Sequence, residues 1–136
     1  MVNLLIFLTP KSETLYLNYN STIRQTLENF DVHKYSVVPL IDDDGFFVST
    51  ISEGDVLRYI KNSCKFDINV AEKNKIKDLE LYRPYRALPI STPMDEVVRL
   101  ALEQNFIPIV DDRGVYIGIV KRKSIIDFLL SKIELN

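Results

Sequence analysis

The stretch VVPLIDDDGFFVSTISEGDVLRYI, residues 37–60, sets the architecture of the chain, because a closely similar stretch occurs again later. The second copy is FIPIVDDRGVYIGIVKRKSIIDFL, residues 106–129. The copies begin 69 positions apart, at 37 and 106, and align without a gap. They share a proline, two aspartates and a glycine, at Pro39/Pro108, Asp42/Asp111, Asp43/Asp112 and Gly45/Gly114. A repeat of this length predicts two similar structural units.

Each copy has the pattern of a strand, a turn, a second strand and a helix. Residues 37–41 and 46–51 are apolar runs, and the Asp-Asp-Asp-Gly sequence between them is turn chemistry. Residues 54–62 then begin a helix. A proline cannot donate to a strand ladder, so we expect Pro39 at a sheet edge or near a strand start. The second turn carries Arg113 among its aspartates, so we interpret both turns as solvated hairpins rather than metal sites.

Similar segments precede the two copies. Residues 1–12 form a short apolar segment that breaks at Thr9-Pro10, and residues 14–18 alternate as a short strand does. Asn20-Ser21-Thr22 offers cap side chains to a helix that runs to about Asp31. In the second half, residues 79–90 parallel the N-terminal segment. Ser91-Thr92-Pro93 predicts a capped helix start, followed by an apolar face of Met94, Val97, Val98, Ala101 and Leu102.

Composition narrows the class of protein. The 136 residues are 46% apolar and 26% charged, as in soluble globular proteins. A net charge of −2 gives no electrostatic reason to expect nucleic-acid binding. The apolar run at residues 4–8 is too short to span a membrane. With a single cysteine, Cys64, no disulfide forms within the chain, so we expect a cytoplasmic protein.

The sequence offers little for catalysis or metal binding. It contains one histidine, His33, and one cysteine, so no metal cluster of the usual ligands is expected. His33 follows a predicted helix with no nucleophile elbow nearby, and no base–nucleophile pair is visible. We therefore expect no catalytic residues, no metal and no enzymatic activity.

The repeated pattern of apolar strand with proline, Asp-Asp-x-Gly turn, strand, Ser-x-x-Asp and helix resembles the CBS domain, named after cystathionine β-synthase. Two in tandem resemble a CBS pair, or Bateman module, in a stand-alone bacterial-type protein. The resemblance covers about residues 11–133. It implies an α/β fold of two β-α-β-β-α units related by a pseudo-twofold axis. The expected organisation is an N-terminal segment at 1–12, CBS domains at 13–62 and 81–136, and a linker at 63–80.

Ser52-Glu53-Gly54-Asp55 is the most informative tetrapeptide, because it lies where a predicted strand meets a helix. Ser-x-x-Asp is close to a capping box, which satisfies free N–H groups at a helix start. The same helix end attracts anions. The resemblance implies that Ser52 contacts phosphate and Asp55 a ribose, with Thr50 beside them. Both interpretations stay open.

The resemblance also implies that this motif faces residues of the other copy across a cleft between the units. Carried over, these ligand-binding candidates are Tyr85, Arg86, Ala87, Asn105 and Phe106. An aromatic ring there stacks on adenine and Arg86 neutralises phosphate, or the two rings belong to the core. In the second copy the tetrapeptide is Lys121-Arg122-Lys123-Ser124, which departs from the family pattern. Its three cations predict either solvated side chains or an anion-binding site.

The leading hypothesis is a non-enzymatic sensor of AMP, ADP or ATP that signals to a separate, unknown target protein. The alternatives are an interaction module with no physiological ligand, or a binder of cyclic di-AMP or S-adenosylmethionine. Self-association is also expected. Apolar residues of the last helix cover a face about 200° wide, broader than one sheet requires: Ile125, Ile126, Phe128, Leu129, Leu130 and Ile133. With Val56, Leu57, Tyr59 and Ile60 of the equivalent helix, they predict a homodimer.

Overall fold

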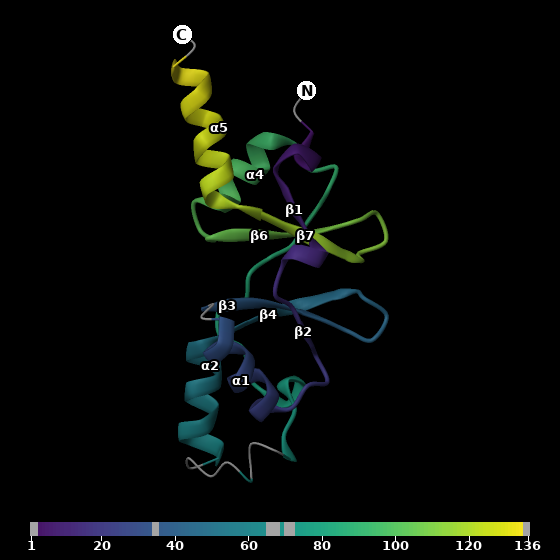
Figure 1. The fold of residues 1–136 in the computed structure, drawn as a ribbon, viewed down its shortest axis with the longest axis vertical. Helices are drawn as coiled ribbons and strands as arrows, with labels where there is room; N and C mark the ends of the chain where they lie inside the picture. The colour runs from purple at the N-terminus through teal and green to yellow at the C-terminus, as the bar shows by residue number, and fades with distance from the viewer. Residues whose placement is uncertain (1–2, 34–35, 65–68, 70–72, 135–136) are drawn as a thin grey trace. The chain divides into compact units, whose positions relative to one another are not determined.

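The computed structural model describes residues 3–33, 36–64, 69 and 73–134. The chain divides into two compact units, each with its own sheet, helices and apolar core (Figure 1). The first-repeat unit is Leu15–Pro84. The second-repeat unit joins Met1–Thr14 to Tyr85–Asn136. The predicted N-terminal segment therefore belongs to the same unit as the second repeat.

The first-repeat unit has the order strand, helix, strand, strand, helix. Its elements are β2 (Leu17–Asn18), α1 (Ile23–His33), β3 (Val37–Ile41), β4 (Phe47–Ser52) and α2 (Glu53–Tyr59). The sheet order is β2-β3-β4, with β2 parallel and β4 antiparallel to β3. Both helices lie on the same face of this sheet (Figure 1). A π-helical turn, Ile60–Cys64, continues α2, and a 3-10 turn occupies Ile76–Asp78.

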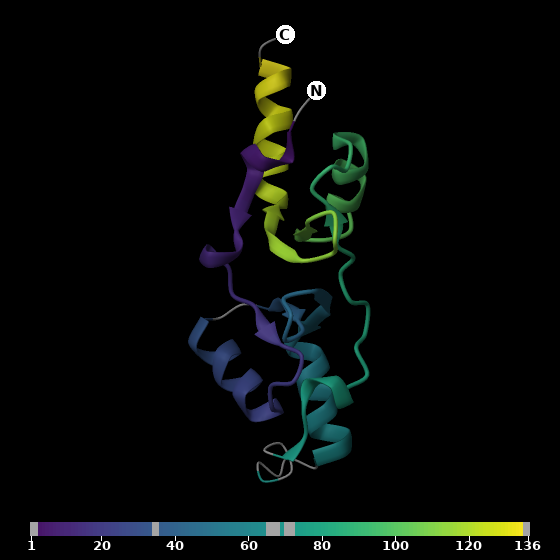
Figure 2. The same cartoon turned by 90° about the vertical axis from the view of Figure 1, so that its right-hand side faces the viewer.

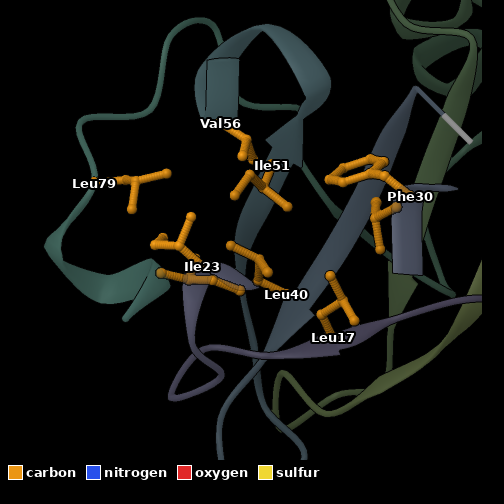
Figure 3. Packing of buried hydrophobic residues seen from close by; sticks show 9 residues of the cluster. Leu17, Ile23, Phe30, Leu40, Ile51, Val56 and Leu79 are labelled. Atoms are coloured by element: carbon orange, nitrogen blue, oxygen red, sulfur yellow. The ribbon is translucent and has the colours of Figure 1, made fainter. Parts of the chain in front are cut away.

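The core of this unit lies between the helices and the sheet (Figure 3). Leu40 and Ile51 point from the sheet toward Ile23 of α1 and Val56 of α2, and all four are at most 1% exposed. Burying one such side chain stabilises the fold by about 1.5–3 kcal/mol. Successive residues of a strand point to opposite faces of the sheet, so Leu40 and Ile51 share the face that the helices cover, and the spacing of Ile23 and Phe30 in α1 turns both toward it.

The end of the predicted linker packs against the start of α1. Ile23 N donates to Asn74 O, and Ile76 N donates to Ser21 O, both at 2.9 Å. The sequence of the linker has few apolar residues, and Val70 and Ile76 are the ones predicted to anchor it. Ile76 is fully buried, whereas Val70 lies outside the described residues. These bonds tie residues 74–76 to the first-repeat unit.

The second-repeat unit repeats this order and adds the N-terminus. Its elements are β5 (Leu88–Pro89), α4 (Met94–Ala101), β6 (Phe106–Val110), β7 (Tyr116–Lys121) and α5 (Arg122–Glu134), preceded by η1 (Leu4–Phe7), β1 (Leu8–Pro10) and η2 (Lys11–Glu13). The sheet order is β1-β7-β6-β5. The predicted pair of β-α-β-β-α units is therefore confirmed.

The N-terminal segment is held by both the sheet and α5. β1 pairs antiparallel with β7, with Pro10 opposite Gly118. The ring of Phe7 packs edge-on against Phe128 of α5, with centroids 5.2 Å apart. Figure 2 shows this segment running beside α5. The segment at Leu8–Pro10 thus supplies an extra edge strand that the repeat itself does not contain.

Several local predictions differ from the structure. The strand expected over residues 14–18 is shorter, because β2 covers only Leu17–Asn18. Residues 11–13, before it in the chain, form the 3-10 turn η2. Pro39, expected at an edge or near a strand start, lies on the middle strand, two residues after the start of β3. Ile41 O accepts from Tyr19 N, so Pro39, two residues earlier, turns its nitrogen to the same side. Pairing with β2 begins only at Leu40, so no ladder bond is lost there.

The predicted capping of α4 is also wrong. Pro93 occupies the cap position without a side-chain bond, and the Thr92 hydroxyl donates to Pro89 O at 2.6 Å. On the apolar face, Leu102 is 80% exposed, whereas Leu100 is buried together with Val97 and Ala101. By contrast, α1 has the expected cap, because Gln25 N donates to Thr22 Oγ1 and Thr22 N to Gln25 Oε1.

Candidate ligand-binding site

Ser52 and Asp55 form a complete capping box at the start of α2. Asp55 N donates to Ser52 Oγ at 3.1 Å, and Ser52 N donates to Asp55 Oδ2 at 2.9 Å. Ser52 ends β4 in extended conformation, which is why the chain turns into the helix at this residue. The capping interpretation of this tetrapeptide is therefore confirmed. It does not decide whether the same residues also bind a ligand.

The carboxylate of Asp55 has further partners. Its Oδ1 accepts from Tyr82 N at 2.9 Å and from Arg58 Nη2 at 3.4 Å. The residue is only 3% exposed. A buried carboxylate needs such donors, because unpaired buried charge is strongly unfavourable. Asp55 thus joins the helix start to the segment that ends the first-repeat unit.

A cavity of about 630 Å³ opens beside Asp55 within the first-repeat unit. It is lined by residues of α2, its π-helical extension and the segment after the Ile76–Asp78 turn: Asp55, Arg58, Tyr59, Asn62, Asp78, Glu80, Leu81 and Tyr82. Small-molecule sites in proteins are commonly about 300–1,000 Å³. The lining combines carboxylates, a guanidinium, an amide and two phenol rings, which are groups able to bind a polar ligand with a planar part.

Thr50 stands apart from this cavity lining. It lies on β4 opposite Pro39, is 2% exposed, and is buried with the sheet. The structure therefore brings Ser52 and Asp55 together, with Thr50 two residues before Ser52 on β4.

The predicted residues of the second copy cluster within the second-repeat unit. The rings of Tyr85 and Phe106 pack edge-on with centroids 5.0 Å apart. Asn105 N donates to the Tyr85 hydroxyl oxygen at 3.2 Å. Phe106 and Ala87 are half-buried. Each ring keeps some exposed surface, and neither belongs to the apolar core clusters of the described residues, so both the ligand-contact and the core interpretations stay predictions.

Gln104 holds this cluster in place, and sequence reasoning missed it. Its Oε1 accepts from Arg86 N at 2.7 Å, and its Nε2 donates to Arg86 O at 3.1 Å and Phe106 O at 3.2 Å. Gln104 is 5% exposed, so these bonds are shielded from water. No sequence signal marks it, because its partner Arg86 lies far earlier in the chain and uses only backbone atoms.

The basic tetrapeptide lies at the junction of β7 and α5. Arg122 Nε donates to Ala101 O at 2.6 Å, at the end of α4. Lys123 Nζ pairs with Asp127 at 3.0 Å, one turn further along α5. Lys121 ends β7 and is exposed. Two of the three cations therefore have protein partners, and the predicted anion site stays a prediction.

The predicted site residues thus fall into two groups in different units. Ser52 and Asp55 belong to the first-repeat unit, and the residues from Tyr85 to Phe106 belong to the second. Arg58 and Tyr82 are, besides Gln104, residues of these two groups that the sequence analysis did not predict as site residues. The spacing of Arg58 three residues after Asp55 on one helix is a usable signal for an ion pair. Tyr82 has no such signal.

The part of the chain that the structure describes contains neither a metal-ligand cluster nor a membrane-spanning helix. Over residues 3–33, 36–64, 69 and 73–134, no group of three or more histidine, cysteine or acidic side chains gathers around a common point. Within that same part of the chain, no helix combines the length and apolar character needed to cross a membrane.

The chain is similar to several known proteins. An uncharacterized protein of Methanocaldococcus jannaschii is 28% identical over 130 residues, covering 74% of this chain and 77% of the relative. The CbpB protein of Listeria monocytogenes in complex with c-di-AMP has a TM-score of 0.82 at 18% identity, with 98% of both chains covered.

Two structures of the CBS-pair protein CBSX2 also match. One, in complex with AMP, has a TM-score of 0.73 at 24% identity, covering 96% of this chain and 98% of the other. The other, from Arabidopsis thaliana, has a TM-score of 0.77 at 26% identity, covering 98% and 97%. The CBS domain model matches residues 8–62 and again residues 76–131. The chain therefore belongs to the CBS domain family and carries two CBS domains in tandem.

Proposed function

We propose that this CBS pair binds an adenosine compound beside Asp55 and reports its presence to a separate protein. The observation that carries the proposal is the carboxylate of Asp55, which lines a cavity of ligand size at the start of a helix. A carboxylate accepts hydrogen bonds from both vicinal hydroxyls of a ribose. Arg58 supplies a cation for phosphate, and the rings of Tyr59 and Tyr82 supply stacking surfaces.

The relatives support this chemistry. CbpB and CBSX2 share the fold and were solved with c-di-AMP and with AMP. AMP, ADP and ATP are the ligands that we propose first, with c-di-AMP and S-adenosylmethionine as alternatives. Ser52 is the proposed phosphate contact, and Tyr85, Arg86, Ala87, Asn105 and Phe106 stay predicted ligand contacts.

A thermal-shift panel of these five compounds tests the proposal. A ligand at a hundred times its dissociation constant stabilises the folded protein by about 2.7 kcal/mol. We expect at least one adenosine compound to raise the unfolding midpoint, and the matched guanosine compound to raise it less. If none of the five shifts the midpoint at millimolar concentration, the sensor function is wrong.

The role of Asp55 is tested by removing a hydroxyl from the ligand and the charge from the side chain, separately and together. A hydrogen bond to a charged group contributes about 1.5–3 kcal/mol, so 2′-deoxy-AMP should bind roughly tenfold to a hundredfold more weakly than AMP. In Asp55→Asn this difference should largely disappear, because the charged acceptor is gone. Calorimetry with both ligands on both proteins measures how far the effect of the ribose hydroxyl depends on Asp55. A loss of the cap alone weakens both ligands equally. An unchanged difference in the folded variant means that Asp55 only caps α2.

A second candidate function is an interaction module, and α5 favours it. Ile126, Leu130 and Ile133 on this helix are 46%, 48% and 69% exposed. Soluble monomers rarely leave a contiguous apolar face of this kind in water. We propose that a second copy of the chain covers it. The homodimer and the sensor are compatible, because they use different elements.

A further inference from the structure

The cavity beside Asp55 carries charges of both signs, and negative groups outnumber positive ones among the described residues that line it. Asp55, Asp78 and Glu80 contribute three carboxylates, whereas Arg58 contributes one guanidinium. Arg58 Nη2 lies 3.4 Å from Asp55 Oδ1, so its positive charge is partly balanced within the cavity. The charged groups of this lining therefore favour a ligand that carries little negative charge.

The guanidinium and the two remaining carboxylates follow an order along the cavity. Tyr82 N donates to Asp55 Oδ1 at 2.9 Å, so the segment that ends at Tyr82 contacts α2 at the start of the helix. Arg58 lies about one turn further along α2 and on the same side as Asp55, because residues three apart on a helix are neighbours. Glu80 and Asp78 precede Tyr82, so they are further from the Asp55 contact along the chain while lining the same cavity. A ligand that extends from Asp55 past Arg58 therefore approaches these two carboxylates.

Contacts on both sides of Glu80 fix the segment that carries it. Leu81 packs against the apolar core of the first-repeat unit. Lys75 N donates to Asp78 Oδ2 at 3.1 Å, at the turn Ile76–Asp78. Glu80 lies in the chain between these two contacts and is exposed. Its position at the cavity is therefore set by neighbours that are themselves held in place.

We propose that the cavity selects among adenosine compounds by charge: it accepts one phosphate group and disfavours a chain of three, with Glu80 and Asp78 as the specificity-determining residues. This inference rests on the proposed function, in which Asp55 binds the ribose and Arg58 the adjacent phosphate. Further phosphates then lie near Glu80 and Asp78, where like charges repel. Water and salt weaken this repulsion, because both side chains are exposed. The selected class is thus a nucleoside monophosphate rather than a triphosphate.

A second guanidinium, outside the lining, reduces the excess of negative charge without cancelling it. The guanidinium carbon of Arg83 lies 5.3 Å from the centre of the Tyr82 ring, but Arg83 is not among the residues that line the cavity. Even when Arg83 is counted, these described residues provide three carboxylates against two guanidinium groups.

Calorimetry with AMP and with ATP measures the selection. The buffer contains little salt and no magnesium, because bound magnesium cancels part of the phosphate charge. We expect AMP to bind about threefold to tenfold more tightly than ATP. The ratio of the two affinities should shrink as the salt concentration rises from about 20 to about 500 mM. A ratio that is independent of salt means that the size of the cavity excludes ATP, and it overturns selection by charge.

Glu80→Gln isolates one of the two charges. Glu80 is exposed and glutamine has nearly the same shape, so the variant should fold. We expect it to bind ATP about twofold to threefold more tightly and AMP with nearly unchanged affinity, and Glu80→Lys to shift the ratio further in the same direction. Asp44→Asn is the matched control. It removes the same charge from an exposed position in the β3–β4 turn, outside the cavity lining, and should leave the ratio unchanged.

The outcomes separate this inference from the proposed function. If AMP binds and ATP binds equally or more tightly at low salt, selection by charge is wrong and the sensor stands. If Asp44→Asn changes the ratio as much as Glu80→Gln does, the net charge of the chain is responsible and Glu80 does not determine specificity. If S-adenosylmethionine binds but neither AMP nor ATP does, the monophosphate class is wrong and the sensor stands. If no adenosine compound binds, the sensor and this inference both fail.

Discussion

At the scale of single residues, Gly118 is constrained by β1, a strand from the start of the chain that lies close to it. A Cβ atom there would lie 2.2 Å from Thr9 O and 3.0 Å from Leu8 Cδ1, and its φ of +152° disfavours other residues. Ser49 occupies the equivalent place in the first copy. The glycine is required because β1 crosses β7 closely at this point.

Gly118→Ala should therefore destabilise the protein strongly. Forcing extra atoms into a packed site costs about 1–3 kcal/mol, and backbone strain adds to this. Urea unfolding measures the change in free energy. Gly54→Ala is the matched control, since its Cβ would meet only Ser52 Oγ at 3.6 Å and alanine favours a helix by about 1 kcal/mol. Equal stability of Gly118→Ala and the unmodified protein would contradict the close approach of β1.

At the scale of elements, the two hairpin turns have the same construction. Asp42 Oδ1 accepts from Asp44 N and Phe46 N, and Asp111 Oδ1 accepts from Arg113 N and Val115 N. Each turn has a glycine at positive φ, 88° at position 45 and 92° at position 114. The N–H of Val115 is the largest cause that holds the pKa of Asp111 below its usual value of 3.8. Desolvation of the carboxyl opposes it, and the N–H and charge of Arg113 and the N–H of Gly114 each lower the pKa by a smaller amount.

This shift predicts how hairpin stability depends on pH. A carboxylate with a lowered pKa stabilises the fold fully above its unfolded pKa, and this stabilisation is lost as the pH falls through the folded value. The stability advantage of the unmodified protein over Asp111→Asn should be constant above about pH 5 and shrink below about pH 4. Asp112→Asn, which removes the neighbouring charge, is the control and should show a smaller dependence. A difference that grows on acidification has the opposite sign and contradicts the shift.

At the scale of the whole molecule, the prominent exposed feature is the outer face of α5. Ile125 is buried and Phe128 packs on Phe7, whereas Ile126, Leu129, Leu130 and Ile133 are exposed. The helix extends well beyond α4 in both views of the fold (Figures 1 and 2). The helix α2 offers less exposed apolar surface for a dimer than the sequence predicts. Leu57 is 61% exposed, but Val56 faces the core. Tyr59, which ends α2, and Ile60, which follows it, are half-buried.

Leu130→Glu should separate the proposed homodimer without unfolding the chain. A charge in an apolar interface loses its hydration without gaining a partner, whereas on an exposed helix it is tolerated. Light scattering should give twice the 15.8 kDa chain mass for the unmodified protein and the single mass for the variant. Ser131→Glu places the same charge on the opposite side of α5 and should stay dimeric. A monomeric unmodified protein at some tens of micromolar rules out the dimer.

Much of the fold was predictable because its signals are local. The apolar strand runs, the Asp-Asp-x-Gly turns and the cap at Ser52 act within a few residues, so the strand–turn–strand–helix pattern was predicted correctly in both copies. The cap predicted at Ser91–Pro93 does not form, because the Thr92 hydroxyl donates to Pro89 O instead of capping α4. Pro39 was expected at a sheet edge or near a strand start, and the sequence does not show that pairing with β2 begins only after it, at Leu40.

Local sequence patterns therefore specify the two β-α-β-β-α units and the helix start that carries Ser52 and Asp55. Three features emerge only from the folded chain: residues 1–14 join the second repeat, Gln104 holds Arg86, and Tyr82 occupies Asp55. Each of these contacts joins residues far apart in the chain, and several use backbone atoms that every residue type possesses. These contacts form because packing brings particular backbone groups within hydrogen-bond distance. They therefore leave no pattern in the sequence of side chains.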